Sequence, residues 1–145
     1  MTSRWNIPEF FAPLPLAAVA LLALNDHILK AQYGNAVTGK LSDVAICFFL
    51  PLFTSAGLGV LGMRNLMHRL AVGCVIAGTV FSMLEMWPAA VRLFCSAMPA
   101  VSSTLWAGHG CHMTSDATDL LCLLLIPLAF IYGCRRAPAQ AMSAR

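Results

Sequence analysis

The sequence predicts an all-α integral membrane protein, folded as a bundle of four transmembrane helices. Hydrophobic residues make up 59% of the 145 residues and charged residues only 10%, whereas a soluble domain carries about a quarter charged residues. The mean hydropathy of +0.77 agrees with this class. A chain of this length is expected to form a single domain, residues 1–145.

Long apolar runs predict where the chain crosses the bilayer. The clearest run, Val44 to Met63, has no charge over a length that crosses a hydrocarbon core of roughly 30 Å. The other three uncharged runs are shorter, so their helices must include flanking acids to cross. A backbone that spans lipid must form helices or a closed barrel. These runs lack the alternation of apolar and polar residues that is typical of barrel strands. We expect spans over about residues 10–29, 44–63, 70–91 and 117–134.

The distribution of basic residues predicts the orientation. With four spans, the termini and residues 64–69 share one side, which holds six arginines and the single acid Glu9. The opposite side holds more acids than bases. Basic segments stay in the cytoplasm, so both termini are predicted to be cytoplasmic. No cleavage site follows the first run, which indicates a span rather than a signal peptide. The sequence contains no basic stripe with interleaved aromatic residues, so it gives no indication of nucleic-acid binding.

Two polar motifs precede apolar runs and resemble each other. Thr38-Gly-Lys-Leu-Ser-Asp43 and Thr114-Ser-Asp-Ala-Thr-Asp119 align at a constant offset, and Pro-Leu follows each at the same distance. This pattern predicts a duplicated helical hairpin with both motifs on the non-cytoplasmic side. We expect two loops on that side, over about residues 31–41 and 94–115.

Charged side chains from all four predicted spans are expected at this side of the membrane. One interpretation is structural: Asp43 and Asp119 cap their helices, aided by Ser42 and Thr118, and ion pairs join the helices. The other is a binding or reaction pocket, since ionisable groups near lipid are costly and often functional. The candidate site residues are Asp26, Lys30, Thr38, Lys40, Asp43, Glu85, Arg92, Thr114, Asp116 and Asp119.

Acids near the carboxyl ends of helices oppose the helix dipole and need partners. Lys30 follows Asp26 by one helical turn, and the two side chains can pair. Arg92 follows Glu85 by two turns on the same face, although Pro88 between them can bend the helix.

Histidines and cysteines give two further candidate sites. His109 and His112, together with His27, could supply metal ligands, but their spacing matches no recognised zinc pattern, and a pair of surface histidines is the alternative. Cys95 and Cys111 both fall on the non-cytoplasmic side, where an oxidising compartment would let them form a disulfide.

Three motifs resemble those of small bacterial multi-span membrane proteins without an assigned activity. The motifs are Asn25-Asp-His-Ile-Leu-Lys30, Thr38-Gly-Lys-Leu-Ser-Asp43 and Thr114-Ser-Asp-Ala-Thr-Asp-Leu120. The resemblance covers most of the chain and implies the bacterial inner membrane, with the motifs facing the periplasm. It implies no activity.

Three functions remain open at this point. The preferred one is a membrane protein without catalytic activity whose polar face binds a partner or small ligand, with lipid around it and another membrane protein or a second copy as its partner. The second is a membrane-embedded enzyme, metal-dependent in one version, that acts on a lipid-linked or periplasmic substrate with an aspartate as general base or metal ligand. The third is an ion-coupled carrier that uses the acids as proton sites.

Overall fold

The first helical segment contains a wider turn near its end. The computed structural model describes residues 10–101 and 117–143, and within them α1 (Pro13–Leu24) continues through a π-helical turn (Asn25–Leu29) into α2 (Lys30–Gln32). Pro13 suits the first turn of α1 because its missing N–H would have no helical partner there. A tight turn follows at Gly34, whose φ of 44° costs glycine little.

The second long helical segment, α3 (Ala36–Val60), begins earlier than the sequence predicts. Asn35 Oδ1 accepts hydrogen bonds from the backbone N–H groups of Val37 and Thr38, both at 3.1 Å. The Thr38 hydroxyl accepts in return from the Asn35 N–H at 3.2 Å. This reciprocal cap satisfies the free donors of the first turn. The predicted loop over 31–41 and the predicted cap at Asp43 are therefore wrong, because the helix has begun two turns before Asp43.

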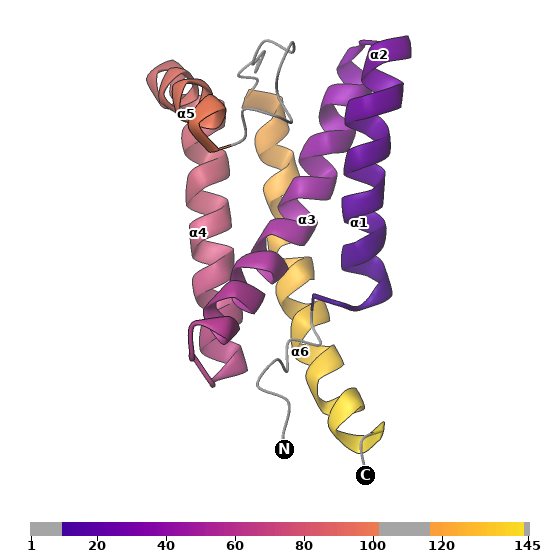
Figure 1. The fold of residues 1–145 in the computed structure, drawn as a ribbon, viewed down its shortest axis with the longest axis vertical. Helices are drawn as coiled ribbons and strands as arrows, with labels where there is room; N and C mark the ends of the chain where they lie inside the picture. The colour runs from indigo at the N-terminus through magenta and orange to yellow at the C-terminus, as the bar shows by residue number, and fades with distance from the viewer. Residues whose placement is uncertain (1–9, 102–116, 144–145) are drawn as a thin grey trace.

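The third helix, α4 (Leu66–Met86), ends at a proline. Trp87 has an extended backbone (φ −127°, ψ 101°), since a following proline disfavours the helical conformation. The chain then forms α5 (Pro88–Val101), which turns away from the axis of α4 (Figure 1). The expected continuous span over 70–91 thus ends at Met86, and a helix replaces the first part of the loop expected over 94–115.

The last helical segment begins as a 3-10 helix. Residues Ala117–Leu124 form this narrower helix, and α6 (Leu125–Ser143) continues from it. Among the described residues every regular element is helical, so the all-α prediction is confirmed.

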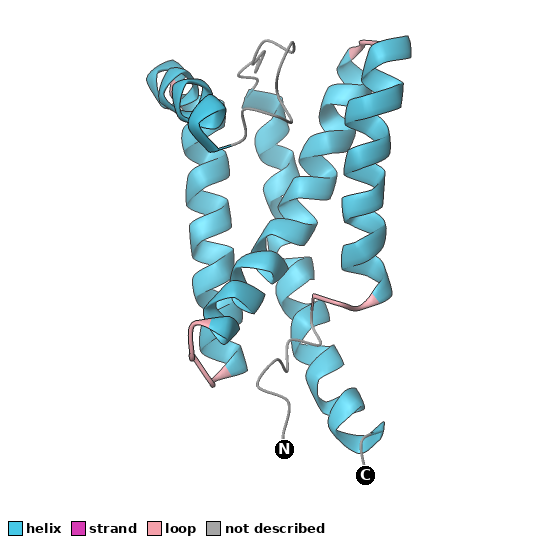
Figure 2. Ribbon diagram, viewed as in Figure 1, coloured by secondary structure: helices cyan, strands magenta, loops and turns pink. Residues whose placement is uncertain are grey.

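Helix α3 lies at the centre of the packing. It contacts α1, α4 and α6, and α4 also contacts α6 (Figure 1). Two buried apolar groups fill the space between these helices. One is centred on Cys47, Phe81 and Ile126, and the other on Leu52, Leu70 and Ala129. The short connections between helices lie at the two ends of the bundle (Figure 2).

Many large apolar side chains are exposed on the outside of the described helices. Val75 and Leu121, for example, are 68% and 71% exposed. Three helical segments are long and apolar enough to cross a membrane, namely Val37–Val60, Leu66–Met86 and Thr118–Arg136. The apolar helix Pro13–Leu29 is shorter. A surface of this kind indicates contact with a lipid bilayer.

Helices α3 and α4 approach each other closely where Gly73 of α4 meets Pro51 of α3. A Cβ atom on Gly73 would lie 2.5 Å from the backbone oxygen of Pro51. That oxygen belongs to the main chain and cannot rotate away, so α3 and α4 would have to separate. Gly57 of α3, by contrast, has nothing within 4 Å of the equivalent position.

We predict that Gly73→Ala lowers the free energy of unfolding by about 1–3 kcal/mol, because the two backbones must move apart. The matched variant Gly57→Ala should leave it unchanged or raise it by up to about 1 kcal/mol, since alanine is the better helix former. Unfolding of the purified protein in detergent measures both values. Equal stability of the two variants would contradict the observed packing.

Candidate functional site

A buried asparagine joins the first helix to α3. Asn25 is 0% exposed, and its Nδ2 donates hydrogen bonds to the Thr38 carbonyl oxygen at 2.6 Å and to Ser42 Oγ at 2.7 Å. Ser42 Oγ donates in turn to Asp26 Oδ1 at 2.9 Å. Two consecutive residues of the first helix therefore reach the same hydroxyl of α3.

The π-helical turn lies at this contact. It comprises Asn25–Leu29 and interrupts an otherwise α-helical segment. Single π turns inside α-helices occur frequently at functional sites. Here the turn contains both Asn25 and Asp26, the two residues that bind Ser42.

A second set of contacts joins α3 to the last helical segment. Lys40 Nζ donates to Thr118 Oγ1 at 2.7 Å and forms a salt bridge with Asp119 Oδ1. The Asp119 side chain is only 10% exposed, whereas that of Lys40 is 46% exposed. These contacts link the two similar sequence motifs directly, since Lys40 belongs to the first and Asp119 to the second.

Two more acids lie close to this salt bridge. Glu85 is buried at the end of α4, and Asp43 is half-buried on α3. Electrostatic interactions from Asp43, Asp119, Lys40 and Glu85 all reach the Cys122 side chain. Charged groups from α3, α4 and the last helical segment therefore converge on one region. We call this region the polar cluster, and it comprises Asn25, Asp26, Lys40, Ser42, Asp43, Glu85, Thr118 and Asp119.

The structure brings together five of the ten residues that the sequence predicted for the polar site. Asp26, Lys40, Asp43, Glu85 and Asp119 all belong to the polar cluster. Thr38 lies beside it, but its hydroxyl caps its own helix and its carbonyl accepts from Asn25. Its side chain therefore has a structural role.

Other predicted residues take no described part in the cluster. His27 is exposed on the π-helical turn, and Arg92 is exposed on α5. Lys30 begins α2, but its side chain lies outside the described part of the structure, so its pairing with Asp26 stays a prediction. The pairing of Glu85 with Arg92 also stays a prediction. Five further predicted residues lie outside the described residues: His109, Cys111, His112, Thr114 and Asp116.

The predicted metal and disulfide sites both fall partly on those undescribed residues. Within residues 10–101 and 117–143, no three His, Cys, Asp or Glu side chains are arranged to hold a metal ion. Cys95 is disulfide-bonded. Its expected partner, Cys111, lies outside the described residues, so the predicted pairing remains a prediction.

The sequence reasoning missed the residues that organise the site. Asn25 appeared only as part of a motif, although an asparagine at the end of an apolar run already needs a polar partner. Asn35 falls in the predicted loop, although its spacing of three residues from Thr38 is that of a capping box. The sequence predicts that Ser42 aids a helix cap, whereas in the structure it bridges Asn25 and Asp26.

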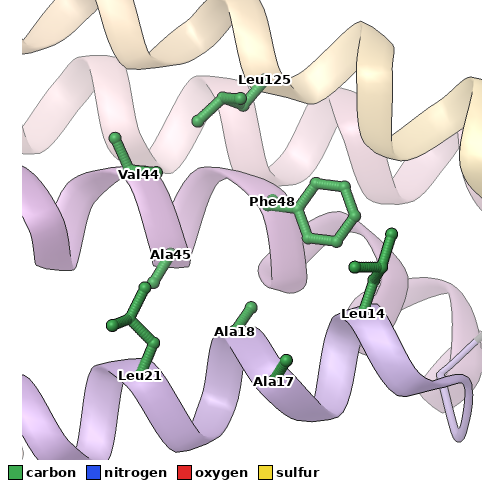
Figure 3. Close-up of a pocket in the computed structure, with 8 residues that line it drawn as sticks. All are labelled: Leu14, Ala17, Ala18, Leu21, Val44, Ala45, Phe48 and Leu125. Atoms are coloured by element: carbon green, nitrogen blue, oxygen red, sulfur yellow. The ribbon is translucent and has the colours of Figure 1, made fainter.

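An apolar groove of about 300 Å³ lies between α1 and α3, on the side of the bundle (Figure 3). Small residues of both helices line it, and larger apolar side chains flank them. These residues are Ala17, Ala18 and Ala45, with Leu14, Leu21 and Phe48. Leu125 of α6 and Val44 complete the lining.

Comparison of the chain with protein-family models, curated proteins and solved structures gave no match. The resemblance of its motifs to small bacterial membrane proteins therefore remains an expectation. The function has to be inferred from the geometry of the polar cluster itself.

We predict that Asn25→Asp destabilises the bundle. Aspartate keeps the shape of asparagine but removes both N–H donors to α3, which should cost at least about 1–3 kcal/mol of unfolding free energy at a buried position. Asn65 provides the matched control, because it only accepts a hydrogen bond, from the His68 N–H at 3.3 Å. Asn65→Asp should therefore be nearly neutral, since aspartate caps a helix equally well. Unfolding curves of both variants with equal midpoints would show that the Asn25 contacts contribute nothing.

Proposed function

We propose that this chain is a small multi-pass membrane protein whose polar cluster binds a partner or ligand at the non-cytoplasmic face. The observation that carries the proposal is the convergence of charged side chains, two of them buried, at one end of an apolar bundle. Lys40 meets Asp119 there, and their charges reach Cys122 together with those of Asp43 and Glu85. Ionisable groups at the border of lipid are costly and mark functional sites more often than other positions do.

The geometry supports four crossings. The helical path from Pro13 to Gln32 comprises α1, the π-helical turn and α2. Twenty residues reach about 30 Å, which matches the hydrocarbon core. The start of α1 and the turn between α3 and α4 lie at one end of the bundle, and α2 and α5 lie at the other (Figure 1). Four alternating passes produce this arrangement.

The charges of the two ends support the predicted orientation. Arg64 precedes α4 and Arg69 lies in its first turn, and Arg135 and Arg136 lie beyond the apolar part of α6. The opposite end carries the polar cluster. Because basic segments are retained in the cytoplasm, the arginine end is the cytoplasmic one. The resemblance of the motifs favours the bacterial inner membrane, so the cluster would face the periplasm.

The helix pairing also supports a duplicated hairpin. Helix α1 packs against α3, and α4 packs against α6. Two copies of one helical hairpin would pair in this way, with the similar motifs at the heads of the second helices. The salt bridge between Lys40 and Asp119 would then join the two copies.

A binding role accounts for the cluster better than stability alone. A buried ion pair is weak support for stability, because removing two charges from water offsets much of their attraction. The described part of the cluster holds four carboxylates, those of Asp26, Asp43, Glu85 and Asp119, and one ammonium group, that of Lys40. Carboxylates accept hydrogen bonds, so this group of acids suits a ligand or partner that donates hydrogen bonds or carries positive charge.

The carrier alternative has less support. Carriers hold their substrate near the middle of the bilayer. The stretches Val44–Val60, Leu70–Leu84 and Leu120–Cys134 contain no charged residue, and the described acids lie at one end of these stretches. The position of the polar cluster therefore favours binding from the aqueous side.

We predict that a photo-cross-linking residue at Val37, exposed near the polar cluster, captures a bound component in intact membranes. Asp43→Asn should reduce this capture about tenfold, the effect of losing one charge-assisted hydrogen bond. It should leave the melting temperature unchanged or raised, because groups kept for binding often reduce stability.

The matched control is the same cross-linker at Met67, exposed at the opposite end. It should not capture the component found at Val37. Unchanged capture in Asp43→Asn together with a lowered melting temperature would mean that the cluster only holds the bundle together.

A further inference from the structure

Helix α5 projects sideways from the end of the bundle that carries the polar cluster (Figure 1). Among the described helices, it makes its main contacts with α4 alone. Helix α4 is a candidate span that ends at Met86, and α5 starts at Pro88, so α5 begins at the end of that span. A helix that leaves the end of a span sideways lies over the lipid that surrounds the bundle.

The exposed surface of α5 consists of two adjacent rows of side chains that differ in polarity. Arg92 and Ser96 form the polar row, and Leu93 and Ala97 form the apolar row; all four side chains are exposed. Residues three or four apart lie on one helix face, so each row is continuous and Ser96 also lies next to Leu93. Leu93 is 72% exposed. A large apolar side chain beside an arginine suits the border between hydrocarbon and headgroups.

The other side of α5 faces the protein. Val91, Phe94 and Cys95 are half-buried, and Cys95 is disulfide-bonded. At 3.6 residues per turn, Cys95 lies nearly opposite Leu93 on the helix. The two exposed rows therefore point away from the protein and towards the surroundings of the bundle.

We propose that α5 is an interfacial helix that rests on the non-cytoplasmic leaflet and binds the phospholipid headgroup region. The inference rests on the topology of the proposed function, in which α4 crosses the membrane, but it concerns a surface outside the polar cluster. Leu93 and Ala97 face the acyl chains. Arg92 lies at the level of the headgroups and donates hydrogen bonds to phosphate oxygens.

The joint between α4 and α5 supports this placement. The exposed apolar surface of α4 continues through Met83 and Met86 up to Trp87, which is 56% exposed. Tryptophan is enriched where hydrocarbon meets headgroups, because its ring is apolar and its N–H needs a polar partner. Helix α5 thus starts beside a residue suited to this border, at the end of a surface that faces lipid.

Other occupants fit the two rows less well. A transmembrane helix of a partner would offer Arg92 only apolar surroundings, which are costly for a charge. A water-soluble partner would have to cover Leu93 and Trp87 while lying against the headgroups. The boundary of the bilayer supplies acyl chains and phosphate oxygens side by side, as the two rows require. Guanidinium groups also match the geometry of phosphate.

Photo-cross-linking in intact membranes tests this inference. A photo-cross-linking residue replaces Leu93 in the full-length protein, and the matched control carries it at Ser96 in the polar row. Mass spectrometry of the purified protein identifies the adducts. We expect phospholipid adducts about tenfold more often at position 93 than at position 96, the preference of one large apolar side chain for apolar surroundings. Protein adducts at position 93, or equal lipid adducts at both positions, would overturn the proposal.

The phosphate contact has its own variants. Arg92→Glu should reduce the lipid adducts at position 93 about tenfold, the effect of losing one charge-assisted hydrogen bond. Arg92→Lys should leave them unchanged, because an ammonium group also binds phosphate. Both variants should keep the melting temperature of the parent protein in a detergent without phosphate. Unchanged adducts in Arg92→Glu together with a lowered melting temperature would assign Arg92 to Glu85 and overturn the proposal.

A cysteine at position 96 separates this inference from the proposed function. It should react with a membrane-impermeant maleimide from outside the cell. Reaction only after the membrane is permeabilised would refute the topology on which the proposed function rests. Reaction from outside without lipid adducts at position 93 would refute the interfacial helix alone.

Discussion

The fold depends on the hydrogen bonds and the salt bridge that join polar side chains at one end of the bundle. Lipid offers no partner to a polar group, so each such group must find one within the protein or at the boundary. The side-chain N–H groups of Asn25 meet this requirement by donating to two groups of α3, and Lys40 does so by binding Thr118 and Asp119. These contacts fix α1 and the last helical segment against α3, whereas apolar packing between helices in lipid has no hydrophobic driving force of its own.

Close packing against α3 also holds the helices together. Helix α3 contacts three other helices, and its backbone at Pro51 approaches Gly73 so closely that no side chain fits between them. Small residues allow this kind of approach and are typical of helix contacts in membranes. The same helix lines one wall of the apolar groove and carries three residues of the polar cluster, Lys40, Ser42 and Asp43. Helix α3 therefore positions both the packing of the bundle and the polar cluster.

The sequence predicted the features that depend on composition and on long apolar runs. The all-helical fold and the convergence of Asp26, Lys40, Asp43, Glu85 and Asp119 follow from those runs and from the acids that flank them. The predicted helix boundaries were wrong where a capping residue or a proline determined them. The cap at Asn35 extends α3 past Lys40, and Pro88 stops α4 at Met86, and neither effect shows in hydropathy. The partner of each charge could not be predicted either, because Lys40 and Asp119 meet only through the arrangement of α3 and the 3-10 helix before α6 in space.

The central claim is that the polar cluster lies at one membrane boundary, opposite the turn between α3 and α4. Labelling of introduced cysteines with a membrane-impermeant maleimide in intact bacterial cells tests it most directly. Suitable positions are Tyr33, Ser96 and Leu61, which are all exposed. Cysteines at positions 33 and 96 should react from outside, and the one at position 61 should react only after the membrane is permeabilised. Reaction of positions 33 and 61 from the same side would contradict the claim.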